Sequence, residues 1–138
     1  MTQLNNNDAA MREVLAGAQV IAVVGHSDNP ARTSYQIARY LRRAGYTVYP
    51  VNPTVNHIDG QPSYASLKDV PAQIDIVNVF RRSEHLPDIV DEAIAAGAKT
   101  VWAQLGVADE DAAQKALSAG LYIAMNTCIK VDHMRLGI

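Results

Sequence analysis

The sequence Val20-Ile21-Ala22-Val23-Val24 is a run of five apolar residues that is followed directly by Gly25. Four of the five are β-branched, and the run is too short for an ordinary helix, so it predicts a strand. Because no polar residue interrupts it, both faces of the strand are expected to be buried. Strands of this kind are typical of parallel sheets that carry helices on both faces.

Strands and helices alternate outward from this run. Strands are predicted where short β-branched segments occur, and helices where apolar residues recur every three or four positions. Gly45 and Gly97 follow two of the predicted helices and are expected to end them. The predicted strands are residues 20–24, 46–51, 74–80, 100–103 and 121–124, and the predicted helices are residues 8–18, 33–44, 83–96 and 109–118.

This alternation predicts an α/β fold, because crossover helices join parallel strands. We expect a Rossmann-like doubly wound sheet with three layers and five strands in the order 3-2-1-4-5, formed by residues 1–138 as a single domain. Ligands bind such sheets beyond the carboxyl ends of the strands, where the strand order reverses, here between the first and fourth strands. The loops to search are residues 25–33, 51–63, 80–86, 104–108 and 125–133.

Composition narrows the class of protein. The chain has 138 residues, of which 49% are hydrophobic and 19% charged, and its lone cysteine is Cys128. A disordered tail would have more charge and fewer apolar residues, and a disulfide-stapled secreted domain would have more than one cysteine, so both classes are excluded. The longest apolar runs are far shorter than the roughly 20 residues of a membrane span, and the polar N-terminus does not resemble a signal peptide. We therefore expect a soluble, cytoplasmic protein with no membrane partner.

The charges are unevenly distributed. The net charge of −2 disfavours nucleic acid as a partner, since duplex binders usually present a basic face. Residues 25–82, however, hold seven basic and four acidic side chains, a net of +3, which leaves −5 for the rest of the chain. This local positive charge suits one small polyanionic ligand, although chance clustering on solvated helix faces is the alternative.

The first loop has features of an anion site. It runs from Gly25 through His26 and Ser27 to Arg32, between a buried strand and a helix N-terminus whose free N–H groups favour a phosphate. Gly25 would allow close approach, and Ser27 and Arg32 could donate hydrogen bonds. A turn whose polar side chains only satisfy backbone groups is the alternative interpretation.

The common dinucleotide and triphosphate motifs are absent. The first loop lacks the Gly-x-Gly-x-x-Gly pattern, and the second strand ends at Val51-Asn52-Pro53 without the carboxylate that holds a ribose. No Gly-x-x-x-x-Gly-Lys-Ser/Thr motif occurs either. The ligand is therefore expected to carry phosphate without being NAD, and Arg81 and Arg82 follow the third strand at the same edge.

Five segments together resemble a known family. They read VVGHS at 23–27, GYTVYPVNP at 45–53, DIVNVFR at 75–81, EAIAAGAK at 92–99 and VWAQLGV at 101–107. In order and spacing they look like the stand-alone CoA-binding domain proteins, which are similar to the N-terminal domain of the succinyl-CoA synthetase alpha subunit. The resemblance extends over nearly the whole chain.

The resemblance implies coenzyme A as the ligand and assigns places around it. The first loop would face the CoA phosphates, Val51-Asn52-Pro53 would border the nucleotide, Phe80 and Arg81 would line the adenine-ribose side, and residues 104–106 would complete the wall. The implied binding residues are Gly25, His26, Ser27, Arg32, Val51, Asn52, Pro53, Phe80, Arg81, Gln104, Leu105 and Gly106. The chain departs from the family at His26, where a small residue is expected, and at Asn126-Thr127-Cys128, where Asp-Arg-Cys is frequent.

A binding function is expected rather than a catalytic one. The synthetases pass phosphate through a histidine of a second domain, for which 138 residues leave no room. The chain is therefore expected to bind CoA or an acyl-CoA without ligase activity and without catalytic residues.

Two other functions stay open. One is a thiol-dependent enzyme or redox switch that acts on a CoA thioester through Cys128 and His133, and the other is an interaction domain without a ligand. The four histidines show no metal-binding spacing, so no metal is expected, and a homodimer is left open.

Overall fold

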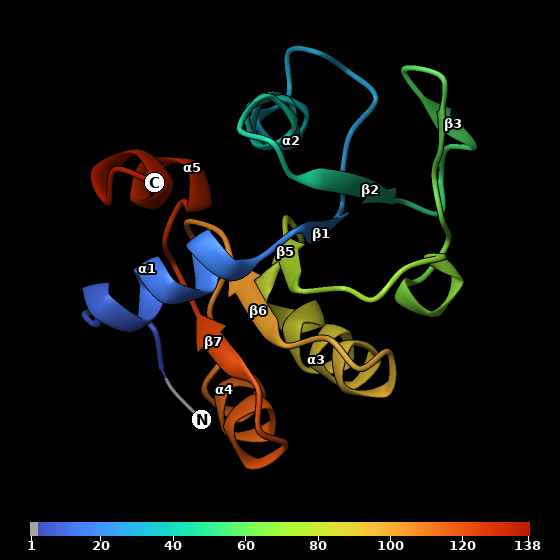
Figure 1. The fold of residues 1–138 in the computed structure, drawn as a ribbon. Helices are drawn as coiled ribbons and strands as arrows, with labels where there is room; N and C mark the ends of the chain where they lie inside the picture. The colour runs from blue at the N-terminus through green and yellow to red at the C-terminus, as the bar shows by residue number, and fades with distance from the viewer. Residues whose placement is uncertain (1–2) are drawn as a thin grey trace.

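A parallel five-stranded sheet forms the centre of the protein, as the computed structural model, which describes residues 3–138, shows (Figure 1). The strand order is β2-β1-β5-β6-β7. The strands are β1 (Val20–Val24), β2 (Thr47–Val51), β5 (Ile76–Val79), β6 (Thr100–Ala103) and β7 (Tyr122–Ala124). All four neighbouring pairs are parallel, which confirms the Rossmann-like α/β class predicted from the sequence.

Helices cover both faces of the sheet. In Figure 1, α2 (Thr33–Arg43) and α5 (Ile129–Arg135) lie above the sheet, and α3 (Leu86–Ala95) and α4 (Glu110–Ser118) lie below it. The helix α1 (Asp8–Gly17) packs into the same hydrophobic cluster as α2 and α5. Alternate residues of β1 enter the two clusters, which explains why a strand between two helical layers is apolar throughout. The three predicted layers are present.

The observed strand order differs from the predicted one in the position of one strand. Residues 76–79 lie beside β1 rather than at the sheet edge, where the sequence placed them. The physical reason is burial: all four residues of β5 are buried, which an edge strand does not achieve, whereas β2 is partly exposed. The outer position beyond β2 is taken instead by Tyr64, which forms a parallel bridge with Val51. If the Tyr64 segment is counted as the third strand along the chain, the first five strands have the order 3-2-1-4-5, and β7 is added beside β6. The order reverses between β1 and β5.

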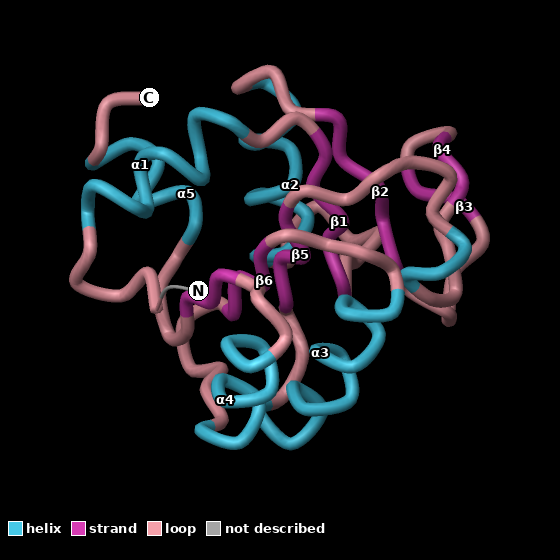
Figure 2. The backbone as a smooth tube through the Cα atoms, turned by 60° about the horizontal axis from the view of Figure 1, so that its bottom comes forward, coloured by secondary structure: helices cyan, strands magenta, loops and turns pink. Residues whose placement is uncertain are grey.

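Short elements fill the connection from β2 to β5. The strands β3 (His57–Ile58) and β4 (Gln61–Pro62) form an antiparallel hairpin, which Figure 2 shows beyond β2, and η1 (Leu67–Asp69) follows as a 3-10 turn. A second turn, η2 (Ser83–His85), leads into α3. The helix α5 begins within residues 125–133, which the sequence predicts as a loop, and continues to Arg135. Within residues 3–138, no helix is both long and apolar enough to cross a membrane.

Candidate ligand site at the carboxyl edge

A cavity of about 350 Å³ opens at the carboxyl ends of β1 and β2, beside the residues that follow β5. This is the point where the strand order reverses, as the topology rule requires of a ligand site. Five of the residues predicted from the sequence line it: Gly25, Val51, Asn52, Pro53 and Arg81. The sequence analysis missed the other lining residues, which carry no motif: Val24, Thr54, Ala65, Leu67, Ile89 and Glu92.

Gly25 is the contact point between the loops after β1 and β5. Its φ is 87°, in the left-handed region, and a Cβ atom at this position would lie 2.6 Å from the carbonyl oxygen of Phe80. Its N–H donates to the carbonyl of Val51 at 2.9 Å, which also joins it to β2. Only glycine fits here, and its lack of a side chain keeps this part of the cavity wall at backbone level.

The rest of the first loop leads into the N-terminus of α2. The N–H of Ser27 donates to the hydroxyl oxygen of Ser34 at 2.9 Å, and the hydroxyl oxygen of Ser27 accepts from the N–H of Asn29 at 3.0 Å. Within residues 3–138 the Ser27 hydroxyl donates to no other group, so its proton is available to a ligand. Arg32 is exposed at the N-cap of α2, whose first turn contains no acidic residue. The loop combines an exposed guanidinium with the positive end of a helix dipole, which suits an anion.

Asn52 ties the two sides of the cavity together. Its Nδ2 donates to the carbonyl oxygen of His26 at 2.9 Å. Its Oδ1 accepts from the N–H of Thr54 at 3.0 Å and from the Thr54 hydroxyl at 2.7 Å. One amide side chain thus holds the loop after β2 against the loop after β1, and Pro53 beside it is exposed.

His26 lies behind the cavity rather than in it. Its side chain is completely buried, with Nδ1 2.8 Å from the carbonyl oxygen of Ser27 and Nε2 3.3 Å from Nη1 of Arg42. Its ring also meets the ring of Tyr35 edge to face, and Tyr35 donates a hydrogen bond to Asp59 in the β3–β4 hairpin. Burial lowers the pKa of His26, so the neutral ring donates to Ser27 and accepts from Arg42. The imidazole supports the first loop from within the core.

The structure does not bring residues 104–106 into this cavity. Gln104 is buried, and its Oε1 accepts from Nδ2 of Asn78 at 3.2 Å and from the N–H of Ile129 at 3.0 Å. Leu105 is 67% exposed, and the N–H of Gly106 donates to Oδ1 of Asn126 at 2.8 Å. The side-chain oxygen of Gln104 therefore connects Asn78 of β5 to Ile129 at the start of α5, and it is used inside the protein.

Phe80 contributes its backbone rather than its ring to the edge. Its side chain packs partly buried against the cluster formed with α1, α2 and α5, and its carbonyl oxygen is the atom that faces Gly25. Arg81 follows it, exposed, and lines the cavity. The Phe80 ring therefore lies on the opposite face of the sheet from Ile89 and Glu92, the residues of α3 that line the cavity.

Cys128 and His133 are not arranged as a nucleophile and its base. Cys128 is buried at the N-cap of α5, and Nδ1 of His133 is 2.6 Å from the hydroxyl of Tyr40. Asp132 pairs with Thr127 and Arg135 instead. Among the residues the structure describes, no hydrogen bond joins the side chains of Cys128, His133 and Asp132; the backbone N–H of Asp132 donates to the carbonyl of Cys128 at 3.0 Å, as in any helix turn. Burial lowers the pKa of His133.

No metal site accompanies these features: within residues 3–138, no three His, Cys, Asp or Glu side chains are grouped to hold an ion. The fold and the edge cavity together define a Rossmann-like α/β domain with a cavity where the strand order reverses. The family follows from comparison with known proteins. A family profile described as "CoA binding domain" matches residues 19–134, and the chain belongs to this family.

Similar proteins of the same size are known in bacteria and archaea. The chain is 43% identical over 129 residues to uncharacterized protein YneT of Bacillus subtilis (strain 168), covering 94% of this chain and 96% of that protein. The solved structure of a hypothetical protein from Pyrococcus horikoshii OT3 superposes with a TM-score of 0.92 at 36% identity and covers 99% of this chain and 96% of that one. The fold is thus shared by stand-alone proteins of this length.

Much longer enzymes contain a homologous region. Over 82 residues the chain is 29% identical to the alpha subunit of the ADP-forming acetate–CoA ligase II of Pyrococcus furiosus, covering 59% of this chain and 18% of that subunit. A dinucleotide-forming acetyl-coenzyme A synthetase 1 of Ca. Korarchaeum cryptofilum matches with a TM-score of 0.73 at 28% identity, over 83% of this chain and 27% of that one. The chain therefore corresponds to less than a third of these ligases.

Proposed function

We propose that residues 1–138 act as one CoA-binding domain that holds coenzyme A or an acyl-CoA at the carboxyl edge of the sheet. The observation that carries this proposal is the cavity at the reversal of the strand order, lined by Gly25, Asn52 and Arg81 in a chain of the CoA-binding family. The wall at Gly25 carries no side chain and leaves room for the ligand. Arg81 in the lining and Arg32 on the first loop are the positive charges that suit phosphates, and among residues 3–138 Glu92 of α3 is the one carboxylate in the lining.

The parts of CoA have distinct places in this proposal. The phosphates contact the first loop, where the Ser27 hydroxyl and the α2 N-terminus donate and Arg32 supplies a positive charge. The nucleotide lies in the cavity between Val51-Asn52-Pro53 and Arg81. His26 acts from behind, by fixing the carbonyl of Ser27.

We further propose that this chain binds CoA without ligating it. In support, the region that residues 1–138 match is a minor part of the ligases, 18% of one chain and 27% of the other. Its place of action in this proposal is the cytoplasm, and its ligand is a small molecule rather than nucleic acid, in keeping with a net charge of −2. A homodimer stays a prediction, which sedimentation velocity of the full chain would test.

Isothermal titration calorimetry of the full chain with CoA, acetyl-CoA and NAD tests the ligand. We expect heat from CoA or acetyl-CoA and none from NAD. Arg32→Ala should weaken CoA binding by about 1.5–3 kcal/mol, because it removes a charge-assisted phosphate contact. Heat from NAD alone would contradict the choice of ligand.

Arg43→Ala is the matched control for this titration. Arg43 is an exposed arginine of the same helix, α2, but lies at its other end, away from the first loop. The two variants remove the same charge from the protein, so a general electrostatic effect would weaken both. We expect CoA affinity to fall only for Arg32→Ala, and an equal loss in both variants would remove Arg32 from the site.

A further inference from the structure

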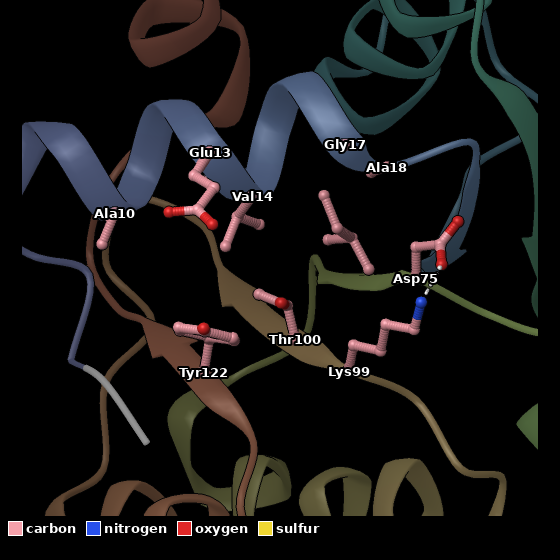
Figure 3. Close-up of a pocket in the computed structure, with 10 residues that line it drawn as sticks. Ala10, Glu13, Val14, Gly17, Ala18, Asp75, Lys99, Thr100 and Tyr122 are labelled. Atoms are coloured by element: carbon pink, nitrogen blue, oxygen red, sulfur yellow. Dashed lines mark ion pairs between the residues drawn. The ribbon is translucent and has the colours of Figure 1, made fainter.

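A second cavity, of about 210 Å³, lies at the opposite end of the sheet, where β5, β6 and β7 begin (Figure 3). The first residues of these strands are Ile76, Thr100 and Tyr122, and they are paired in register. Residues paired in register on parallel strands direct their side chains to the same face of the sheet. The three side chains therefore form a row across the amino edge, beneath α1.

The helix above this row has little side-chain volume. Ala10, Val14 and Gly17 line the cavity and recur at helical spacing, so they face the sheet together. A Cβ atom on Gly17 would meet nothing within 4 Å. The hollow thus follows from residue size: small residues of α1 lie opposite the strand starts and do not fill the space between.

The cavity has an excess of negative charge. Its carboxylates are Glu13 and Asp75 and its cation is Lys99. Asp75 is already satisfied, since it accepts from the N–H groups of Gln19 and Val20 at 2.8 and 2.9 Å and lies 3.5 Å from Nζ of Lys99. Glu13 is exposed and has no ion pair among residues 3–138. The C-terminal end of α1, whose last turn has no basic residue, adds partial negative charge.

Two hydroxyl groups face the same space. Thr100 is only 2% exposed and lines the cavity; its hydroxyl makes no hydrogen bond within residues 3–138, and it is not one of the fully buried polar atoms without a partner, so solvent in the cavity reaches it. A ligand in the cavity can take the place of that solvent as its hydrogen-bond partner. The Tyr122 side chain also lines the cavity, and Figure 3 shows both residues on the sheet side of the space, with Glu13 and Val14 on the helix side.

We propose that this cavity binds a small amphipathic amine. Its ammonium group lies between the Glu13 carboxylate and the hydroxyls of Thr100 and Tyr122, and its short hydrocarbon body packs on Val14 and Ile76. The volume calls for a compact molecule, since sites for drug-sized ligands measure about 300–1,000 Å³. The ammonium can donate at once to the unpaired Glu13 carboxylate and to the Thr100 hydroxyl oxygen. This site lies at the other end of the strands from the proposed CoA site and does not depend on it.

Titration of the ¹⁵N-labelled full chain with n-butylammonium chloride, followed by NMR, tests the site. We expect saturable shifts of the amide signals of Val14, Thr100 and Tyr122. Sodium butyrate, which has a similar body and the opposite charge, and ammonium chloride, which has the charge without the body, should give none. Equal shifts with either control salt, or no shift with butylammonium, would overturn the proposal.

Norvaline distinguishes an amino acid from a simple amine as the ligand, because it is butylamine with a carboxylate added to the carbon that bears the amine. Tighter binding than butylammonium would support the proposal with an amino acid as ligand, since Lys99 would then meet the added carboxylate. Weaker binding would support it with a simple amine.

Glu13→Gln is the decisive variant. Glu13 is exposed and unpaired within residues 3–138, so the change should leave folding intact, as a thermal melt would verify. Amine affinity should fall about tenfold or more, because the glutamine amide oxygen still accepts a hydrogen bond but the negative charge that strengthens it is lost. Glu110→Gln, on exposed Glu110 of α4, is the control and should change nothing. Unchanged amine affinity in Glu13→Gln would overturn the proposal, and CoA affinity should be unaffected in both variants.

Discussion

The two ends of the sheet are built in different ways. At the carboxyl edge, loops from β1, β2 and β5 are held to one another by the hydrogen bond that Asn52 donates to the carbonyl of His26 and by the close approach of Gly25 to Phe80. At the amino edge, the cavity walls are strand starts in register and a helix with small residues. The first site depends on backbone geometry that few sequences permit, whereas the second depends on side-chain size. Mutations should therefore affect the two ends differently.

The largest effect is expected from Gly25→Ala. A left-handed φ costs an ordinary L-residue about 1–2 kcal/mol, and the contact with the Phe80 carbonyl should add about 1–3 kcal/mol of overpacking. The unfolding free energy from urea denaturation measures the sum, and CoA affinity should fall with it because the loop must shift.

Gly120→Ala separates these two costs. Gly120 has a φ of 85°, close to that of Gly25, but a Cβ there would meet nothing within 4 Å. The Gly120→Ala variant should lose only the unfolding free energy that the left-handed φ costs, and it should keep its CoA affinity. Equal losses in both variants would show that the approach of the two loops is not what makes Gly25 special.

A smaller effect is expected from Gln104→Leu. The change leaves the N–H of Ile129 without its acceptor, which should cost about 1–3 kcal/mol of stability. Because Gln104 does not line the cavity, CoA affinity should change little. Gln114→Leu, at an exposed position of α4, is the control. A large loss of CoA affinity at unchanged stability would mean that Gln104 contacts the ligand, as the family resemblance implies.

The pH dependence of stability should be smaller still. Burial lowers the pKa of both His26 and His133 from the ordinary 6.5, so the unfolded chain binds protons that the folded chain does not. The unfolding free energy should therefore be constant above this ordinary pKa and should fall as the pH drops below it, by at most about 1.4 kcal/mol per pH unit for each histidine.

Urea denaturation between pH 7.5 and 5.5 measures this slope. His26→Gln should reduce it, while His57→Gln, at an exposed position of the hairpin, should leave it unchanged. A slope that is the same in wild type and His26→Gln would show that His26 is not held neutral by its burial.

Much of the fold follows from local pattern. The apolar run at residues 20–24 and the glycines after the helices predict the strands and helices, and the topology rule then places the ligand loops at the carboxyl edge. Gly25, Asn52 and Arg81 could be predicted because each directly follows a strand of that edge. The sheet position of residues 76–79 was assigned wrongly, since pairing partners depend on burial that only the assembled sheet defines.

Other features carry no local signal. Nothing near His26 in the sequence shows that Arg42 and Tyr35 enclose it, because these residues meet it only through tertiary packing. The same is true of Gln104 and Ile129, which are 25 positions apart along the chain. The amino-edge cavity depends on a row of three strands beneath α1 and could not be read from spacing along one segment.

One measurement tests the assignment of CoA to the carboxyl edge most directly. The ¹⁵N-labelled full chain is titrated with CoA, and amide shifts are mapped by NMR onto the two ends of the sheet. We predict saturable shifts at Gly25, Ser27 and Asn52, and none at Thr100 or Tyr122. Shifts centred on the amino edge, or no shift at either end, would contradict the account.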